Sequence, residues 1–381
     1  MIEYYAHHIY PAIASVLSRI SGLVPFSFSA LLLILVVLLY LFKLAQAIRQ
    51  KRGIRCLLLR LTLPLILAVS WMYATWGVLY FRDSWYQRTG IEKAAPDSVA
   101  YLQFLDHYIE NLNRSYTQSR TSPLLIPISA TQSHTSQAHT SKILTNQPPP
   151  AETRQTYPLP SRATLPDSAM QPLSDPIAAD WWGSEQAVAA DALIEQAYQT
   201  IGTRLGIAYP NGKRRPKKVF MEWYYTRTSI LGYFLPFFHE IHLNPRQPWL
   251  QYPASLAHEK AHQFGITSEA ECNFYGYLAC IASTDPFIQY SGYFSVLGYI
   301  AADARRLLPA TYRTHLANIE PGIRQESALL SAYWKSQQHE KLSRIQNKVY
   351  DTYLKANRIP TGIKNYSEVT ALLLTYHSAV R

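Results

Sequence analysis

Two long uncharged stretches near the start of this 381-residue chain restrict its fold more than any other feature. Residues Gly22 to Phe42 and Leu61 to Phe81 contain no charged side chain. Each is about 20 residues long, the length that a helix needs to cross the hydrocarbon core of a bilayer. A pair of buried core helices would rarely be so long and so free of charge. The sequence therefore predicts a membrane anchor of two transmembrane helices over residues 23–82.

A short basic segment separates the two stretches and predicts their orientation. Residues 43–60 carry five Lys or Arg side chains in Lys43-Leu-Ala-Gln-Ala-Ile-Arg-Gln-Lys-Arg-Gly-Ile-Arg55, and a sixth at Arg60. The positive-inside rule places such a loop in the cytoplasm. Residues 1–22 and everything after Phe81 then lie outside, in the periplasm if the chain belongs to the inner membrane of a two-membrane bacterium. An aromatic belt is expected at the outer end of the second helix, formed by Trp71, Tyr73, Trp76, Tyr80, Trp85 and Tyr86.

The first apolar stretch also has a competing interpretation as a secretory signal. Leu44-Ala-Gln-Ala47 is similar to a signal-peptidase site. In a signal peptide, however, the basic segment precedes the apolar one, whereas here it follows. The sequence therefore favours an uncleaved anchor.

The motif that carries chemistry is His258-Glu-Lys-Ala-His262, an H-E-x-x-H pattern. Two residues four apart lie on one face of a helix, so both imidazoles can bind one ion. Zinc accepts such nitrogen ligands and leaves one position open for water in a catalytic site. Glu259 is then the expected general base. Pro253 suits the first turn of this helix and Gly265 suits its end.

A third ligand is expected in Ser268-Glu-Ala-Glu-Cys-Asn-Phe274. Glu269 and Glu271 both qualify. Ser268 and Glu271 have the spacing of a capping box, which would give Glu271 a structural role and favours Glu269 as the ligand. Asn273 lies four residues after Glu269 and is expected to orient a ligand histidine.

The remaining sequence predicts a mainly α chain with a small β-sheet: the two-helix anchor followed by a zincin-like α+β metallopeptidase domain. Residues 83–114 start the outer domain as a helix, residues 115–177 are a flexible insertion rich in Ser, Thr and Pro, and residues 178–381 form the domain itself. Residues 218–225 are expected to form a strand. The segment from Ile230 to Asn244 is expected to form a strand pair or a bent strand beside the motif helix.

Further residues are candidates for the substrate cleft. A peptide can bind as an extra strand along the edge of a sheet, so Tyr233, His239, Glu240 and His242 are candidates to line the cleft. Ordinary strand positions are the more common role for the two histidines. Tyr290 or Tyr293 could donate a hydrogen bond to a developing oxyanion, and Tyr293 is the expected one, although core packing is the more common role of such tyrosines.

The charge distribution and the cysteine content predict neither a nucleic-acid-binding protein nor a disulfide-stabilised one. Part of the net charge of +11 lies in the basic loop, and no basic–aromatic motif predicts nucleic-acid binding. Cys272 and Cys280 are eight residues apart on one predicted helix, too far for an unstrained disulfide.

Several motifs together resemble those of a known family. They are Trp76-Gly-Val-Leu-Tyr80, Arg88-Thr-Gly90, Gly232-Tyr-Phe-Leu-Pro236, His258-Glu-Lys-Ala-His262-Gln, Glu269-Ala-Glu-Cys-Asn-Phe274, Tyr290-Ser-Gly292 and Tyr353-Leu-Lys-Ala-Asn357 with Gly362. In this order they are similar to an uncharacterised bacterial integral-membrane family of zincin type, known as a domain of unknown function. Lys260 and Cys272 depart from the usual H-E-L-A-H-Q and E-x-E-A-N-F forms. The resemblance implies a membrane-anchored metallopeptidase-like domain and supports Glu269 and Asn273 in their roles.

The expected function is that of a zinc metallopeptidase that hydrolyses proteins or peptides of the cell envelope, with Zn²⁺ as its cofactor and the bilayer as its anchor. Two alternatives stay open. One is a non-catalytic envelope protein that keeps the fold and works through interactions. The other is a zinc amidase that acts on cell-wall peptides.

Overall fold

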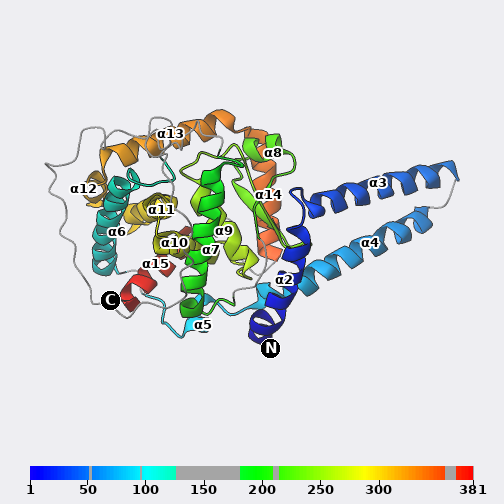
Figure 1. Ribbon diagram of the computed structural model, residues 1–381, viewed down its shortest axis with the longest axis horizontal. Coiled ribbons are helices and arrows are strands. Elements are labelled where there is room, and N and C mark those ends of the chain that lie inside the picture. Colours follow the sequence, from blue (N-terminus) through cyan, green and yellow to red (C-terminus); the bar gives the residue numbers. More distant parts are fainter. Residues whose placement is uncertain (51–53, 95–96, 126–180, 209–213, 357–365, 381) are drawn as a thin grey trace, which may run out of the picture.

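The computed structural model describes residues 1–50, 54–94, 97–125, 181–208, 214–356 and 366–380. Over these residues the chain is mainly helical and contains one small three-stranded sheet, as the sequence predicts. Figure 1 shows a helical body from which two long helices, α3 and α4, project side by side.

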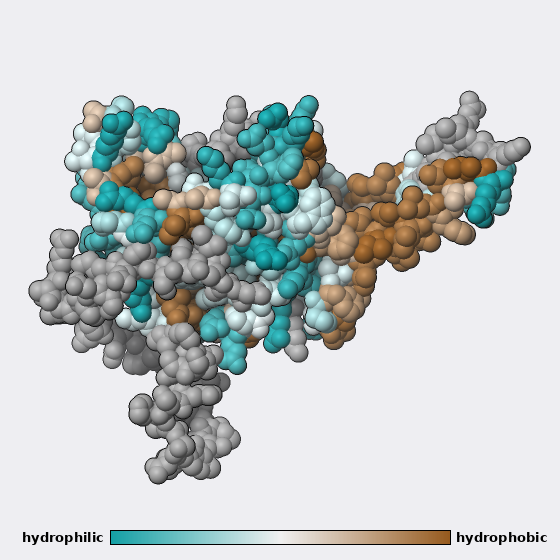
Figure 2. Space-filling model, turned by 90° about the horizontal axis from the view of Figure 1, so that it is seen from above, coloured by the Kyte–Doolittle hydropathy of each residue, from teal (hydrophilic) through white to brown (hydrophobic). Residues whose placement is uncertain are grey.

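The projecting hairpin consists of α3 (Phe28–Arg49) and α4 (Ile54–Thr75). Within its most apolar window, only 6% of α3 is buried, and Figure 2 shows the hairpin covered with hydrophobic residues. Among the described residues, α3 is the one helix long and apolar enough to cross a membrane, and the apolar part of α4, Pro64–Thr75, is shorter. The second stretch was expected to remain a single helix up to Phe81. Instead, α4 ends at Thr75 and a 3₁₀ turn, η2 (Gly77–Phe81), follows.

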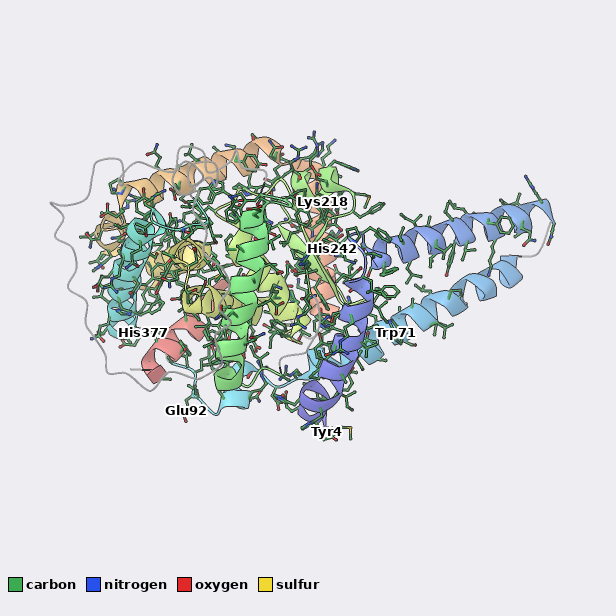
Figure 3. All side chains as sticks on the ribbon, viewed as in Figure 1. Tyr4, Trp71, Glu92, Lys218, His242 and His377 are labelled. Atoms are coloured by element: carbon green, nitrogen blue, oxygen red, sulfur yellow. The ribbon has the colours of Figure 1, made fainter. Side chains whose placement is uncertain are left out.

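The expected aromatic belt is only partly present, because some of its residues pack against the body. Trp71 and Tyr73 are exposed near the base of the hairpin, where Figure 3 labels Trp71. Trp76 is instead buried in a small cluster with Tyr10 and Leu79, and Trp85 is buried in the main core. The last residues of the second apolar stretch and those that follow it therefore pack against the body.

The chain before the hairpin lies against the body as a nearly continuous helical stretch. It consists of α1 (Ile2–Tyr4), the π-helix η1 (Tyr5–Ile9) and α2 (Tyr10–Ser21). On α2, Tyr10, Ala14 and Leu17 are buried, whereas Val16 and Ile20 are exposed. One face of α2 thus joins the body and the other faces outward.

The sheet contains β1 (Lys217–Lys218), β2 (Gly232–Leu235) and β3 (Glu240–Leu243) in the order β1-β3-β2. β3 is central, parallel to β1 and antiparallel to β2. The prediction of a strand over residues 218–225 was wrong beyond Lys218. Met221 adopts a left-handed conformation (φ 62°), which ends the extended backbone, and α8 (Glu222–Arg227) follows.

The helical body is built around α10 (Glu269–Ala282), which packs against α7 (Glu185–Leu205), α9 (Tyr252–Gln263), α11 (Pro286–Leu307) and α15 (Tyr366–Val380). The remaining helices surround this centre: α5 (Trp85–Thr89), α6 (Ser98–Ser119), α12 (Tyr312–Ala317), α13 (Pro321–Gln337) and α14 (Glu340–Ala356). One core cluster includes buried residues from Trp85 to Leu374, so residues 83–125 belong to the same body as the later helices.

Residues 115–119 do not belong to a flexible insertion, which was predicted over residues 115–177. Residues 115–119 are the last turn of α6, in which the buried Ser115 and Ser119 hydroxyls donate to the carbonyls of Leu112 and Tyr116. Local bonds of this kind let serine fit a helix end despite its preference for turns. Residues 126–177 of the predicted insertion lie outside the described residues.

Candidate metal centre

The motif helix α9 and its partner α10 bring the predicted ligands together. Gly265 ends the first helix in a left-handed conformation (φ 87°) that glycine adopts without strain. Ser268 then caps α10 by accepting a hydrogen bond from the Glu271 amide. The two helices approach closely at Gly276, where a Cβ atom would lie 3.1 Å from the backbone nitrogen of His258. This close packing brings the first turn of α10 next to both histidines.

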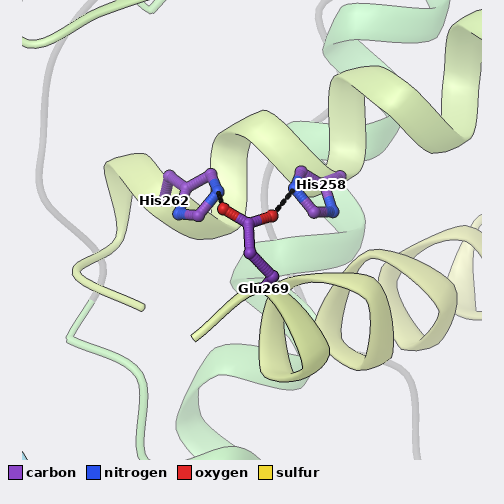
Figure 4. A group of neighbouring side chains, drawn as sticks. All are labelled: His258, His262 and Glu269. Carbon is purple, nitrogen blue, oxygen red and sulfur yellow. Dashed lines mark ion pairs between the residues drawn. The ribbon is translucent and has the colours of Figure 1, made fainter. Parts of the chain in front are cut away.

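His258, His262 and Glu269 converge on one point (Figure 4). The Nε2 atom of His258 lies 3.2 Å from one Glu269 carboxylate oxygen, and Nε2 of His262 lies 3.5 Å from the other. Zinc bonds of 2.0–2.1 Å in a tetrahedron place ligand atoms about 3.3 Å apart. The donor set and its spacing therefore fit a zinc ion held by these three residues.

The other ring nitrogens of the two histidines are already bound to acceptors. Nδ1 of His258 lies 3.1 Å from the Asn273 side-chain oxygen, and Nδ1 of His262 lies 2.9 Å from the Ile266 carbonyl. A proton on each Nδ1 leaves Nε2 free to bind a metal, which is how partners of this kind orient ligand histidines. Asn273 thus occupies the orienting position expected from the sequence.

The two positions at which the motifs depart from their usual form have structural partners. Lys260 is fully buried and pairs with Asp191 and Glu195 of α7, at 2.8 and 2.5 Å. The Cys272 sulfur lies 3.2 Å from Nδ1 of His262. Burial lowers the pKa of His262, but the Cys272 thiol and the Glu269 carboxylate outweigh it, so the pKa is raised well above its ordinary value.

Glu271, the alternative third ligand, lies on another side of α10. Its carboxylate accepts hydrogen bonds from the Trp85 amide at 2.9 Å and from Arg88 at 2.6 Å. Glu271 thus fastens α5 to α10, and its side chain does not reach back to the Ser268 amide as a full capping box requires. Of the two candidates, Glu269 is the one in the His258 and His262 cluster.

Glu259 is a buried carboxylate beside the cluster. Its Oε2 atom makes no hydrogen bond within the described part of the chain. Burial raises the pKa of Glu259 to about 6. Both Glu259 and His258 line a cavity of about 770 Å³ that extends between α9, α11 and α13. A buried base that faces a cavity of this size can act on a water molecule and on a bound substrate.

The residues predicted to form the substrate cleft mostly have other contacts. Glu240 and His239 are buried against the N-terminal segments, where Glu240 binds the start of α3 and His239 contacts Tyr10. His242, labelled in Figure 3, is buried in β3 and stacks on Tyr233 with 4.7 Å between ring centroids. None of these four is among the described residues that line the cavity, which include Gly232 of the same strand pair.

The tyrosine expected to serve the site is also placed elsewhere. Tyr293 contacts Tyr108 and Tyr277 away from the cluster, and the hydroxyl of Tyr290 donates to Glu326. Instead, Tyr350 of α14 donates a hydrogen bond of 2.5 Å to Glu269. No spacing in the sequence connects these two residues, which are 81 positions apart.

Trp76 is a second residue near the site that the motif does not indicate. Its indole donates to the His262 carbonyl at 3.3 Å, and its ring packs edge-on against the imidazole. Trp76, which was predicted to lie at the membrane surface, is therefore in direct contact with a candidate metal ligand.

The model of a family described as "Protein of unknown function (DUF3810)" matches residues 5–374. No curated protein and no solved structure matches the chain.

Proposed function

The chain belongs to the DUF3810 family, and we propose that it is a membrane-anchored zinc metallopeptidase with a zincin-like domain. The observation that carries this proposal is the convergence of His258, His262 and Glu269 beside a buried, unpaired Glu259 oxygen on a large cavity. Three protein ligands and an adjacent carboxylate base are the combination that zinc hydrolases use.

The proposed reaction is hydrolysis of a peptide bond. When bound, zinc lowers the pKa of a water molecule to about 7 and polarises the substrate carbonyl. Glu259 takes one proton from the attacking water, whose oxygen bonds to the carbonyl carbon. The carbon–nitrogen bond then breaks, and Glu259 passes the proton to the leaving nitrogen. Its buried position next to the ligand cluster and on the cavity suits Glu259 to this role.

Other residues of the chain hold this arrangement. Asn273 and the Ile266 carbonyl fix the orientation of the two imidazoles, and Tyr350 holds the Glu269 carboxylate. The edge strand β2 lies next to Glu259, because a Cβ atom at Gly232 would lie 3.0 Å from Glu259 Cγ. An extended peptide could add to this edge as a fourth strand. Gly232 therefore replaces the four residues predicted from the sequence as the contact between the sheet and the cleft.

The proposed anchor consists of α3 and α4 as two spans, with the basic loop in the cytoplasm and the catalytic domain in the periplasm. The exposed apolar surface of both helices supports this arrangement. Removal of the N-terminal part as a signal peptide would also strip the body of Tyr10, which donates to the Gln263 carbonyl of the motif helix. Proteins and peptides of the cell envelope are the substrates available at this location.

The test compares the purified, zinc-loaded protein with Glu259→Gln on a proteome-derived peptide library and on cell-wall fragments. We expect new peptide termini with the wild type and a loss of at least about 100-fold with the variant, which keeps all three ligands. Cleavage of cell-wall fragments alone would favour the amidase. A zinc-loaded wild type that cleaves neither would favour the interaction protein and contradict the proposal.

A further inference from the structure

We propose that the substrate is a membrane-tethered polypeptide whose scissile bond lies within a few residues of the bilayer surface. This inference rests on the metallopeptidase and membrane-anchor functions proposed above. It follows from the bonds that fasten the anchor to the strand beside Glu259.

The first of these connections is made by Glu240 at the start of β3. Its carboxylate accepts hydrogen bonds from the backbone amides of Phe28 and Ser29, at 2.9 and 3.0 Å, and from the Ser27 hydroxyl at 2.9 Å. Lys217 of β1 donates to the same carboxylate at 2.6 Å. The first turn of α3 is therefore fixed to the end of the sheet by a buried ion pair.

The turn between β2 and β3 provides the second connection. The ring of Phe238 contacts Phe28 of α3, with 5.6 Å between centroids. The carbonyl of Phe237 accepts a hydrogen bond from the exposed Trp71 indole of α4 at 3.2 Å. This turn lies between the bases of both hairpin helices, at the level where aromatic side chains mark a bilayer surface.

The height of the site above that surface follows from the length of β2. Leu235, at one end of the strand, pairs with Glu240, and Gly232, at the other end, lies beside Glu259. Three residues of extended chain span about 10 Å, and any tilt of the strand reduces the height. The base and the neighbouring metal ligands therefore lie about 10–15 Å from the bilayer surface.

The motif helix is held at the same height by the segments that flank the hairpin. At its end, the carbonyls of His262 and Gln263 accept hydrogen bonds from Trp76 and Tyr10. Arg82 donates a hydrogen bond to the Gly265 carbonyl, two residues after Gln263. Bonds on both sides of the anchor leave the site little freedom to move away from the membrane.

The surface next to the anchor suits the same position. Val16, Ile20 and Leu23 expose apolar side chains just before α3, and Phe26 continues the row. Figure 2 shows the hydrophobic colour of the hairpin continuing onto the adjoining surface of the body. The domain would therefore rest on the bilayer, with the Glu259 end of the cavity closest to the lipid headgroups and its far end, at α12 and α13, pointing away from them.

This geometry predicts a strong preference for tethered substrates. An extended peptide covers 10–15 Å with about three to five residues. A chain anchored in the same bilayer by one end presents these residues to the site at a millimolar effective concentration. A soluble peptide gains nothing from the anchor of the enzyme.

The experiment uses the full-length zinc-loaded protein in liposomes with one peptide library in two forms, free and palmitoylated at one end. We expect the palmitoylated form to be cleaved at least about 10-fold faster, at positions within about eight residues of the lipid, with the advantage lost in detergent. Equal cleavage of the two forms, or cleavage only far from the lipid, would overturn this inference and leave the proposed function standing. A loss of all cleavage in both forms, as in Glu259→Gln, would overturn both.

A second measurement tests the geometry without catalysis. Cobalt bound at the site should quench a fluorophore on lipid headgroups at a distance of about 15 Å, and His258→Ala should abolish the quenching. A distance more than twice as long would contradict the inference even if peptides are cleaved. Failure of the wild type to bind cobalt or zinc would instead contradict the proposed function as well.

Discussion

The Glu240–Lys217 pair allows the coupling between anchor and domain to be tested quantitatively. Both side chains are almost completely buried, and Glu240 also accepts two amide hydrogen bonds from the start of α3. Removal of one partner from a buried ion pair costs about 3–5 kcal/mol, because the other charge is left without compensation. We therefore expect Glu240→Ala to lower the free energy of unfolding by about 4 kcal/mol. This range includes the loss of the hydrogen bonds that the first turn of α3 donates to Glu240, because the free energies of the ion pair and of these bonds are not additive.

The assay is urea unfolding of the protein in nanodiscs, followed by tryptophan fluorescence. Lys217→Met should be destabilising too, and the double variant should lose less than the sum of the single losses, because the pair is coupled. Glu222→Ala is the matched control: Glu222 pairs with Arg246 at the same distance of 2.6 Å, but on the surface. We expect that control to cost less than about 1 kcal/mol. A loss of this small size for Glu240→Ala would refute the inference that Glu240 fastens the anchor.

Three other perturbations test the site and its surroundings. Asn273→Ala should weaken zinc binding about 10- to 100-fold, measured by competition with a chelator, because His258 loses its orienting acceptor; unchanged affinity would contradict this role. Gly232→Ala should slow peptide cleavage while zinc stays bound, because the added Cβ would lie 2.8 Å from the His242 carbonyl oxygen and 3.0 Å from Glu259 Cγ. An unchanged cleavage rate would show that β2 can shift freely. Burial lowers the pKa of His239 to about 3, so the unfolded chain takes up its proton below pH 6.5 while the folded chain does not. The free energy of unfolding should thus fall by about 2 kcal/mol between pH 6.5 and 5 because of His239. Asn suits the left-handed backbone at this position, φ 58°. In urea unfolding at both pH values, His239→Asn should therefore show a decrease that is smaller by this amount.

The parts of the site that the sequence could predict are those governed by local helix geometry. His258 and His262 share a face because they are four residues apart, and Ser268 caps the next helix because of its own side chain. These local rules also place Glu269 and Asn273 together on one face of α10. Two short segments of sequence thus indicate most of the ligand cluster and its support.

The parts that could not be predicted depend on contacts between distant segments. Tyr350 reaches Glu269 from a helix 81 residues later, and Glu240 binds Ser27, which precedes it by 213 residues. Lys260 looks unsuitable in the motif until α7 supplies its two carboxylates. No periodicity or composition encodes such pairings, because they arise from the packing of whole elements.

The predicted end of the second apolar stretch was wrong for a related reason. Hydropathy reports how apolar a segment is, but not whether lipid or protein covers it. Trp76 and Leu79 are buried against Tyr10, which lies before the first apolar stretch. The helix therefore stops at Thr75, where the protein body begins.

The most direct test of the account is the metal content of the detergent-purified protein and three variants. We expect about one zinc per chain in the wild type, the stoichiometry of a single catalytic site. His258→Ala should lose the metal and Glu269→Gln should bind it far more weakly, whereas Glu271→Gln, which changes the contact with Arg88, should retain it. A wild type that contains no zinc after purification without chelators, or zinc that depends on Glu271 and not on Glu269, would contradict the proposed metal centre.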